Sequence, residues 1–287
     1  MNKPDRLNGV IRAWEEGRPA FACFAKAGRE TAIDLSDSPY DGIIFEMEHN
    51  PWDVVGLQDS LQYLLNRRQI ASTASLAPRV TPLVRIPSNG VEKNQAFAKQ
   101  ALDRGVYGVV WPHINDVEQA RNAVAACRYP RPESAPLYAP AGTRGDGPAS
   151  ACRYWGLSQQ DYYANADVWP LATQGEILVF LMIESVRGIA NLEQILSEVP
   201  GIGCVLIGEG DLSQELGFPR DYDHPMVRDA MAQIVATCHK HTVPVGHPHV
   251  TSANLERLLA EGYRFLMSAP VRSYGVVGKG RGSYSGE

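Results

Sequence analysis

Ionisable residues stand at the ends of six successive apolar segments of this chain. The segments, whose interiors carry almost no charge, are 42–47, 81–87, 108–114, 176–184, 203–211 and 243–249. The residues at their ends are, in chain order, Glu46, Glu48 and His49, then Arg85, His113, Glu184, Glu209 and Asp211, and finally His247 and His249. Burying charged groups is costly unless they pair or bind a metal. This clustering therefore indicates a functional site.

Glu184 and Asp211 end neighbouring segments at matching positions. Two carboxylates so placed suit a hard divalent cation such as Mg²⁺ or Mn²⁺. The alternative is that each one caps the helix that follows, since acidic groups stabilise helix N-termini. The matched pair, with an arginine opposite, favours a metal site.

Arg85 follows three apolar residues, so its guanidinium needs a carboxylate or an oxyanion as partner. We expect it to bind substrate; the alternative is a structural ion pair to Glu46 or Glu48. His49 is the expected general base, because a turn after the strand would let Glu46 orient its imidazole. The alternative for His49 is a helix-capping or core histidine.

His247 and His249 lie two residues apart and could, with a carboxylate, bind zinc or iron. We favour a role in lining the pocket, with His247 among the substrate contacts. No lysine stands at the ends of the last four apolar runs, which disfavours a Schiff-base aldolase. Any carbonyl chemistry should therefore depend on the metal.

Eight apolar runs must position these residues: the six above together with 20–26 and 264–270. Continuous apolar runs are typical of parallel strands buried on both faces. Segments with helical periodicity alternate with them, at 53–66, 116–128, 187–199 and 253–263, and 4–17 precedes the first run. The alternation predicts a (β/α)8 TIM barrel with its active site at the carboxyl ends of the strands. The alternative is an open doubly wound sheet, but no GxGxxG motif follows the first run.

We expect a single domain over residues 1–287. Residues 129–170, before the fifth barrel strand, are rich in Pro, Gly, Tyr and Ala and show no strand pattern. A connection of this length predicts a lid or an interface insertion. Residues 272–287 are rich in Gly and Ser, so the eighth helix should be short, frayed or absent.

The composition excludes several classes of protein. Lys+Arg 27 against Asp+Glu 32 gives a net charge of -5, with no sign of a basic nucleic-acid-binding face. No apolar run reaches the roughly 20 residues of a membrane span, and the start of the chain is no signal peptide. The five cysteines are odd in number and far apart, which indicates reduced thiols in a cytoplasmic protein.

Several stretches, among them GIIFEMEHNPWD, TPLVRIPSNG, VFLMIES and VLIGEGDLSQELGFP, resemble in order and spacing the HpcH/HpaI family of metal-dependent (class II) 2-oxo-acid aldolases. The resemblance runs from about residue 18 to 270. It implies a (β/α)8 barrel, usually a hexamer built as a trimer of dimers with the last helix exchanged between neighbours. It also implies a divalent metal (Mg²⁺, Mn²⁺ or Co²⁺) and reversible cleavage of a 4-hydroxy-2-oxo acid to pyruvate, or a related 2-oxo acid, and an aldehyde.

The resemblance further implies roles for individual residues. Glu184 and Asp211 match the two metal-ligating carboxylates, and Arg85 matches the arginine that holds the 2-oxo oxygen. His49 matches the histidine of the acid/base dyad. The backbone amides of Gly210 and Asp211 match those that receive the substrate carboxylate.

Other positions depart from the family pattern. The dyad partner is usually Asp but is Glu46 here, and a position that is often Gln is Met182. The histidines His113, His247 and His249 are not typical of the better-known members. These changes concern the aldehyde half of the site more than the pyruvate half.

Two other functions are compatible with the same pattern. An acyl-CoA lyase of the citrate-lyase type would need a basic groove for the CoA phosphates, and only Arg131, Arg144 and Arg153 are candidates for one. A non-catalytic barrel that binds a carboxylate ligand would explain Glu46 and Met182 as marks of lost catalysis.

Overall fold

The computed structural model describes residues 6–87, 91–93, 95–269 and 275–283. Its barrel strands are β1 (Ala20–Ala25), β2 (Gly42–Glu46), β3 (Thr81–Arg85), β4 (Gly108–Trp111), β6 (Ile177–Ile183), β7 (Cys204–Ile207), β8 (Val245–His247) and β9 (Phe265–Met267). Each lies within one of the eight apolar runs of the sequence.

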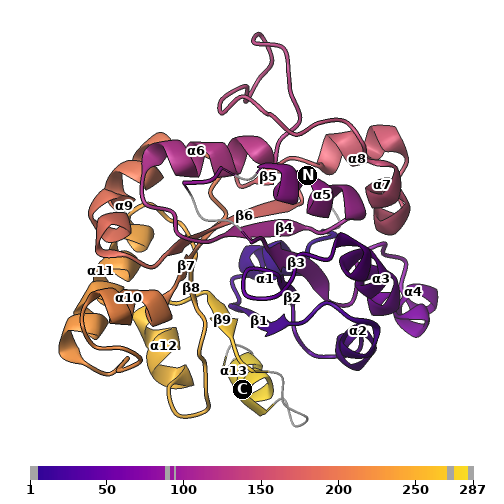
Figure 1. The fold of residues 1–287 in the computed structure, drawn as a ribbon. Coiled ribbons are helices and arrows are strands. Elements are labelled where there is room, and N and C mark those ends of the chain that lie inside the picture. Colours follow the sequence, from indigo (N-terminus) through magenta and orange to yellow (C-terminus); the bar gives the residue numbers. More distant parts are fainter. Residues whose placement is uncertain (1–5, 88–90, 94, 270–274, 284–287) are drawn as a thin grey trace.

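These eight strands form a closed parallel barrel (Figure 1). Neighbours in the chain pair in parallel, as in Cys23↔Ile43 between β1 and β2. Two further pairings complete the ring: β1 pairs with β9, and β4 pairs with β6. The predicted (β/α)8 barrel is therefore confirmed, and the open-sheet alternative is excluded.

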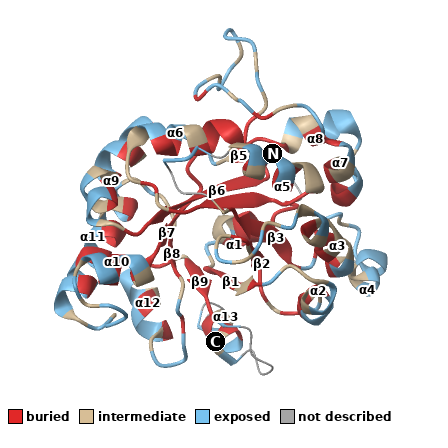
Figure 2. Ribbon diagram, viewed as in Figure 1, coloured by how far each residue is buried: buried red, intermediate tan, exposed pale blue. Residues whose placement is uncertain are grey.

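Helices surround the barrel, with buried residues toward the strands and exposed faces outward (Figure 2). The four helices predicted from periodicity are present as α3 (Val54–Leu64), α6 (Val117–Ala126), α9 (Val186–Glu198) and α12 (Leu255–Glu261). The others around the barrel are α2 (Arg29–Leu35), α4 (Arg67–Ser72), α5 (Gln95–Arg104), α10 (Glu209–Glu215) and α11 (Pro225–Lys240). Asp116 is the N-cap of α6, and its side chain accepts a hydrogen bond from the Gln119 amide at 3.0 Å.

The helix α1 (Gly9–Glu15) covers the amino ends of the strands. The Gly9 amide donates to the hydroxyl of Thr81 at the start of β3, at 2.7 Å. The Asn8 side chain donates to the carbonyls of Tyr107 and Glu176, which precede β4 and β6. A barrel closed at this end leaves the opposite end for chemistry.

The segment 129–170 lies at this amino end, because α6 runs back from the end of β4 before the segment begins. It was expected to lack a strand, but it contains α7 (Ala149–Trp155), α8 (Gln159–Asn165) and the two-residue strand β5 (Val168–Trp169), which pairs with the start of β6. Two residues are too few to show a period in a sequence. The connection between α6 and α7 projects from the body of the molecule (Figure 1).

The last described helix is α13 (Gly275–Gly282). In this chain it packs against its own barrel: Val277 is buried, and Arg281 pairs with Asp41 at 3.0 Å. A side chain at Gly280 would overlap the ring of Phe21 on β1. Residues 272–274 and 284–287 of the predicted C-terminal segment lie outside the described residues.

All five cysteines are free, and four of them are buried. Among the described helices, none has the length and hydrophobicity needed to cross a membrane.

Candidate active site at the carboxyl ends of the strands

The charged residues singled out in the sequence meet at one end of the barrel, because all its strands run in the same direction. We call this end the mouth, meaning the carboxyl ends of the barrel strands and the residues that directly follow them. Glu46, Arg85 and His247 are the last residues of β2, β3 and β8. Glu184 follows β6 directly, and Asp211 lies in the first turn of α10 after β7.

His113, Glu184 and Asp211 form a group that could hold a metal ion. One ligand atom from each residue lies within 4.8 Å of those of the other two. The three residues come from the ends of β4, β6 and β7, which are neighbours in the barrel. Two carboxylates and an imidazole are donors that divalent cations such as Mn²⁺ accept. We refer to this group as the acidic triad.

The Glu184 carboxylate is buried, with only 3% of the side chain exposed. Its Oε1 accepts a hydrogen bond from the backbone amide of His113 at 2.5 Å and lies 3.4 Å from the His113 Nδ1. Burial raises the pKa of Glu184 to about 7, and the nearby carboxylates of Glu48 and Asp211 add to this. A divalent cation would stabilise the charged form, so these donors fit a metal.

Gly208, which precedes α10, leaves the space that Glu184 occupies. An added Cβ at Gly208 would lie 2.9 Å from the carboxyl carbon of Glu184 and closer still to its Cβ and Oε2. Because Gly208 has φ -94°, steric overlap and not backbone conformation makes glycine necessary here.

We expect Gly208→Ala to weaken metal binding about tenfold, because Glu184 must move away from its place in the acidic triad. Calorimetric titration of the metal-free protein with Mn²⁺ would measure this effect. The matched control is Gly210→Ala, where an added Cβ meets nothing within 4 Å. Equal Mn²⁺ affinity in the two variants would contradict the packing role of Gly208.

Arg85 lies between two carboxylates. Its guanidinium pairs with Glu46 and, at 2.9 Å, with Glu48. It also stacks on the Phe24 ring at 4.6 Å and donates to the Met182 sulfur at 3.6 Å. The ion pair expected as an alternative is thus present with both acids. The buried Nε–H finds no acceptor among the described residues, so one donor is left for a ligand.

Glu46 holds the backbone of His49, not its imidazole. Its Oε1 accepts hydrogen bonds from the amides of Glu48 and His49 at 2.8 and 3.1 Å. The His49 imidazole is 68% exposed, and its Nε2 lies 3.6 Å from Glu48. We expected Glu46 to orient this imidazole, but the carboxylate that faces it in the structure is Glu48.

His247, expected among the substrate contacts, is buried. Its Nδ1 accepts a hydrogen bond from the His249 amide at 3.1 Å, and its Nε2 lies 3.4 Å from Glu209. Burial lowers the pKa of His247. With both nitrogens engaged, His247 faces the protein. The exposed imidazole at this place is that of His249, whose Nδ1 is hydrogen-bonded to Glu209.

Gly210 and Asp211 lie in the first turn of α10, where helix amides have no intrahelical acceptor. The structure therefore leaves their N–H groups available for an anion. A side chain at Gly210 would meet no protein atom within 4 Å, which agrees with open space beside this turn.

Sequence reasoning missed the part of His113 in the acidic triad. Its backbone is left-handed, with φ 54°, and this conformation accompanies the bond from its amide to Glu184. Strained backbone of this kind is common at functional sites. Glu48 was also given no catalytic or binding role, although it pairs with Arg85 and lies 3.6 Å from the His113 Nε2. Burial raises the pKa of Glu48. The only signal in the sequence was that both residues end apolar segments.

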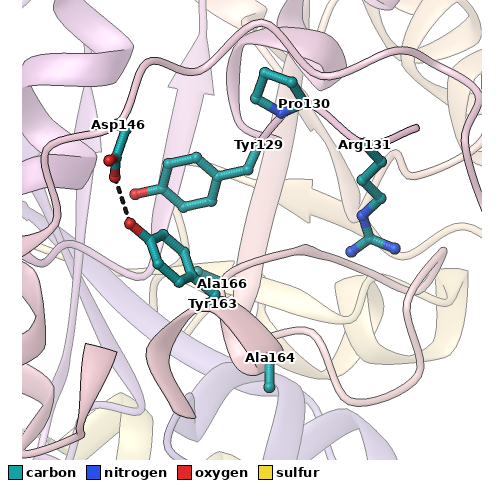
Figure 3. Close-up of a pocket in the computed structure, with 7 residues that line it drawn as sticks. All are labelled: Tyr129, Pro130, Arg131, Asp146, Tyr163, Ala164 and Ala166. Carbon is teal, nitrogen blue, oxygen red and sulfur yellow. Dashed lines mark hydrogen bonds between the residues drawn. The ribbon is translucent and has the colours of Figure 1, made fainter. Parts of the chain in front are cut away.

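A cavity of about 510 Å³ lies far from the mouth, in the 129–170 segment (Figure 3). The rings of Tyr129 and Tyr163 meet edge to face there, and the Tyr163 hydroxyl donates to Asp146. The arginines considered for CoA binding also belong to the amino end of the barrel: Arg131 pairs with Asp167, Arg144 with Asp103, and Arg153 with Gln62. They do not form a basic groove beside the acidic triad.

Fold and site together define a (β/α)8 barrel with an acidic mouth whose side chains could hold a metal ion. The model of the family described as "HpcH/HpaI aldolase/citrate lyase" matches residues 21–269. The chain belongs to this family.

Similar proteins agree with this assignment. A hydroxypyruvate/pyruvate aldolase of Paraburkholderia phytofirmans is 28% identical over 256 residues, 89% of this chain and 88% of the relative. A 2-keto-3-deoxy-L-rhamnonate aldolase of Klebsiella pneumoniae is 32% identical over 231 residues, 80% of this chain and 74% of the relative. The crystal structure of an HpcH/HpaI aldolase/citrate lyase family protein from Burkholderia cenocepacia superposes with a TM-score of 0.74 at 26% identity, covering 97% of both chains.

The protein is therefore an aldolase, a carbon–carbon lyase of a family that generally depends on a divalent metal ion. The non-catalytic alternative is set aside by these relatives.

Proposed function

We propose that the protein cleaves a 4-hydroxy-2-oxo acid reversibly into pyruvate, or a related 2-oxo acid, and an aldehyde, with Mg²⁺, Mn²⁺ or Co²⁺ as cofactor. The acidic triad carries this proposal. In it, Glu184 and Asp211 hold the metal, and His113 is close enough to add a nitrogen ligand. When bound, the cation supplies Lewis-acid polarisation of the 2-oxo group.

Arg85 and the first turn of α10 bind the 2-oxo acid. The free Nε–H of Arg85 donates to the 2-oxo oxygen, where negative charge develops as the C3–C4 bond breaks. Glu46 and Glu48 fix the plane of the guanidinium through its other nitrogens. The amides of Gly210 and Asp211 receive the substrate carboxylate at the positive end of the helix.

His49 accepts the proton of the 4-hydroxyl group, directly or through a water molecule. Glu46 positions the His49 backbone, and Glu48 lies 3.6 Å from the His49 Nε2. The pair that acts on the proton in this chain is thus His49 with Glu48, while Glu46 orders the loop that carries them.

We also propose an assembly state and a location for the protein. We expect a homo-oligomer, a hexamer built as a trimer of dimers, and a cytoplasmic location. The assembly agrees with the projecting α6–α7 connection, where Leu137 is 45% exposed and could meet a neighbouring copy. Light scattering of the purified protein would measure the oligomeric state.

The proposed function is tested by exchange of the C3 protons of pyruvate in D₂O, which needs no aldehyde. We expect exchange with Mg²⁺, Mn²⁺ or Co²⁺ and at least about a hundredfold loss after chelation and dialysis, since the Lewis-acid polarisation of the 2-oxo group would then be lost. Restored exchange on adding back the metal is the control. Exchange that survives chelation would contradict the metal dependence, and no exchange with any of the three metals would contradict the function.

A further inference from the structure

A second acid–imidazole pair lies at the mouth, outside the machinery described above. Glu209, with 2% of its side chain exposed, accepts a hydrogen bond from the His249 Nδ1. This pair is more tightly held than His49, whose imidazole is 3.6 Å from Glu48 and beyond hydrogen-bond distance. A buried carboxylate that orients a histidine is a common arrangement in active sites.

The hydrogen bonds of this cluster assign the tautomers of both histidines. The His247 Nδ1 accepts from the His249 amide, so the hydrogen of neutral His247 is on Nε2, facing Glu209. The His249 Nδ1 faces the other oxygen of Glu209 and must carry the hydrogen of that bond. The Nε2 of neutral His249 is therefore a free acceptor.

The ring of His249 is fixed in orientation but remains open to ligands. It stacks on Tyr222, from the α10–α11 connection, with ring centroids 5.6 Å apart and planes 13° apart. Its side chain is nevertheless 57% exposed. The Tyr222 hydroxyl is buried without a hydrogen-bond partner among the described residues. The two stacked rings thus each carry a polar atom with hydrogen-bonding capacity to spare.

The strand order places this pair on the opposite side of the acidic triad from His49. Going round the barrel, β2 carries His49, then β4, β6 and β7 carry the acidic triad, and β8 carries His249. A substrate bound at the triad thus has an imidazole on either side. His49 is already assigned to the 4-hydroxyl group, so His249 is available to the rest of the aldehyde half.

The charge of the mouth restricts what that half can be. Among the described residues at the strand ends, five carboxylates stand against Arg85 and Lys26, so a divalent cation still leaves net negative charge. The five are Glu46, Glu48, Glu184, Glu209 and Asp211. An aldehyde with a second carboxylate would be repelled, and an aldehyde without a hydroxyl group would make no hydrogen bond to the His249 Nε2.

We propose that His249 determines specificity for the aldehyde half, by accepting a hydrogen bond from a hydroxyl group on the carbon next to the aldehyde carbonyl. Glu209 is its positioning residue. The substrates that this selects are neutral hydroxyaldehydes. The proposal rests on the proposed function and extends it to the part of the substrate that the acidic triad does not contact.

The test is the aldol addition of pyruvate to glycolaldehyde, acetaldehyde or glyoxylate. In each reaction pyruvate loses a C3 proton, C3 bonds to the aldehyde carbon, and the aldehyde oxygen gains a proton. We expect the wild type to prefer glycolaldehyde to both other aldehydes. In His249→Phe, which keeps a ring on Tyr222, the ratio of kcat/KM for glycolaldehyde to that for acetaldehyde should fall about tenfold, as for one lost hydrogen bond.

Two further variants separate specificity from stability. His241→Phe is the matched control, because the His241 imidazole also pairs with a carboxylate, Glu193 at 3.0 Å, but at the C-terminal end of α11, far from the mouth. The aldehyde ratio should not change in that variant. In Glu209→Gln the amide N–H would face an imidazole N–H, and two facing donors disturb the orientation of His249. We therefore expect a higher KM for glycolaldehyde, and a KM for acetaldehyde that changes less than about twofold.

An unchanged ratio in His249→Phe, or an equal loss with both aldehydes, would overturn the assignment of His249. Absence of pyruvate proton exchange in the wild type would instead overturn the proposed function. In that case the nitrogen NMR signal of the His249 Nε2 decides the binding role by itself: a shift with glycolaldehyde but not with acetaldehyde supports it, and no shift with either overturns it.

Discussion

Glu184→Gln is expected to lose turnover and to bind Mn²⁺ at least about a hundredfold more weakly than the wild type. The substitution keeps the shape of the side chain but removes one of the two carboxylate charges of the acidic triad. Hard cations are held mainly by anionic oxygens, and the amide cannot replace that charge. Calorimetric titration with Mn²⁺ and the pyruvate exchange assay measure the two effects separately.

The same strand offers a matched control for this variant. Glu176 directly precedes β6, as Glu184 directly follows it, and its side chain is equally buried at 3% exposure. It pairs with Arg6 at 3.3 Å and accepts from the Asn8 amide at 2.8 Å. Glu176→Gln should lower the Tm by several degrees, because it weakens a buried ion pair, and should leave Mn²⁺ affinity as it is. If Glu184→Gln bound Mn²⁺ as tightly as Glu176→Gln, Glu184 would not be a metal ligand.

Arg85→Lys is expected to lower kcat/KM about a hundredfold. The guanidinium contacts Glu46 and Glu48 through different nitrogens and keeps its Nε–H for the substrate. A lysine has one ammonium group, which cannot bridge two acids and also reach the 2-oxo oxygen. Each hydrogen bond between charged groups that is lost contributes about 1.5–3 kcal/mol. Steady-state kinetics of the aldol reaction and the rate of pyruvate exchange measure the loss.

Arg6→Lys provides the comparison for Arg85→Lys. Arg6 is also buried between two acids, Glu15 at 2.6 Å and Glu176 at 3.3 Å, but at the amino end of the barrel. We expect a lower Tm and unchanged kcat/KM. Pyruvate exchange near the wild-type rate in Arg85→Lys would show that Arg85 is only a structural ion-pair partner, the alternative that its contacts with Glu46 and Glu48 leave open.

The barrel could be predicted from the sequence because its strands carry a strong and local signal. An apolar run such as 176–184 can only be buried on both faces, and regular alternation with amphipathic segments leaves few folds. The strand β5 (Val168–Trp169) was missed because two residues carry no period. The segment 129–170 lies at the amino end of the barrel because α6 runs back from the end of β4. The composition of the segment does not reveal this position.

The residue types that do chemistry, and their gathering at one end of the barrel, were determined by the sequence alone, because the carboxyl ends of parallel strands must meet. Only the tertiary structure decided which groups pair. His113 lies with Glu184 and Asp211. The His49 imidazole faces Glu48 and not Glu46. His247 is buried, whereas His249 is exposed. Hydrogen bonds depend on tenths of an ångström and on loop conformation, such as the left-handed backbone of His113, and spacing along a chain does not encode these.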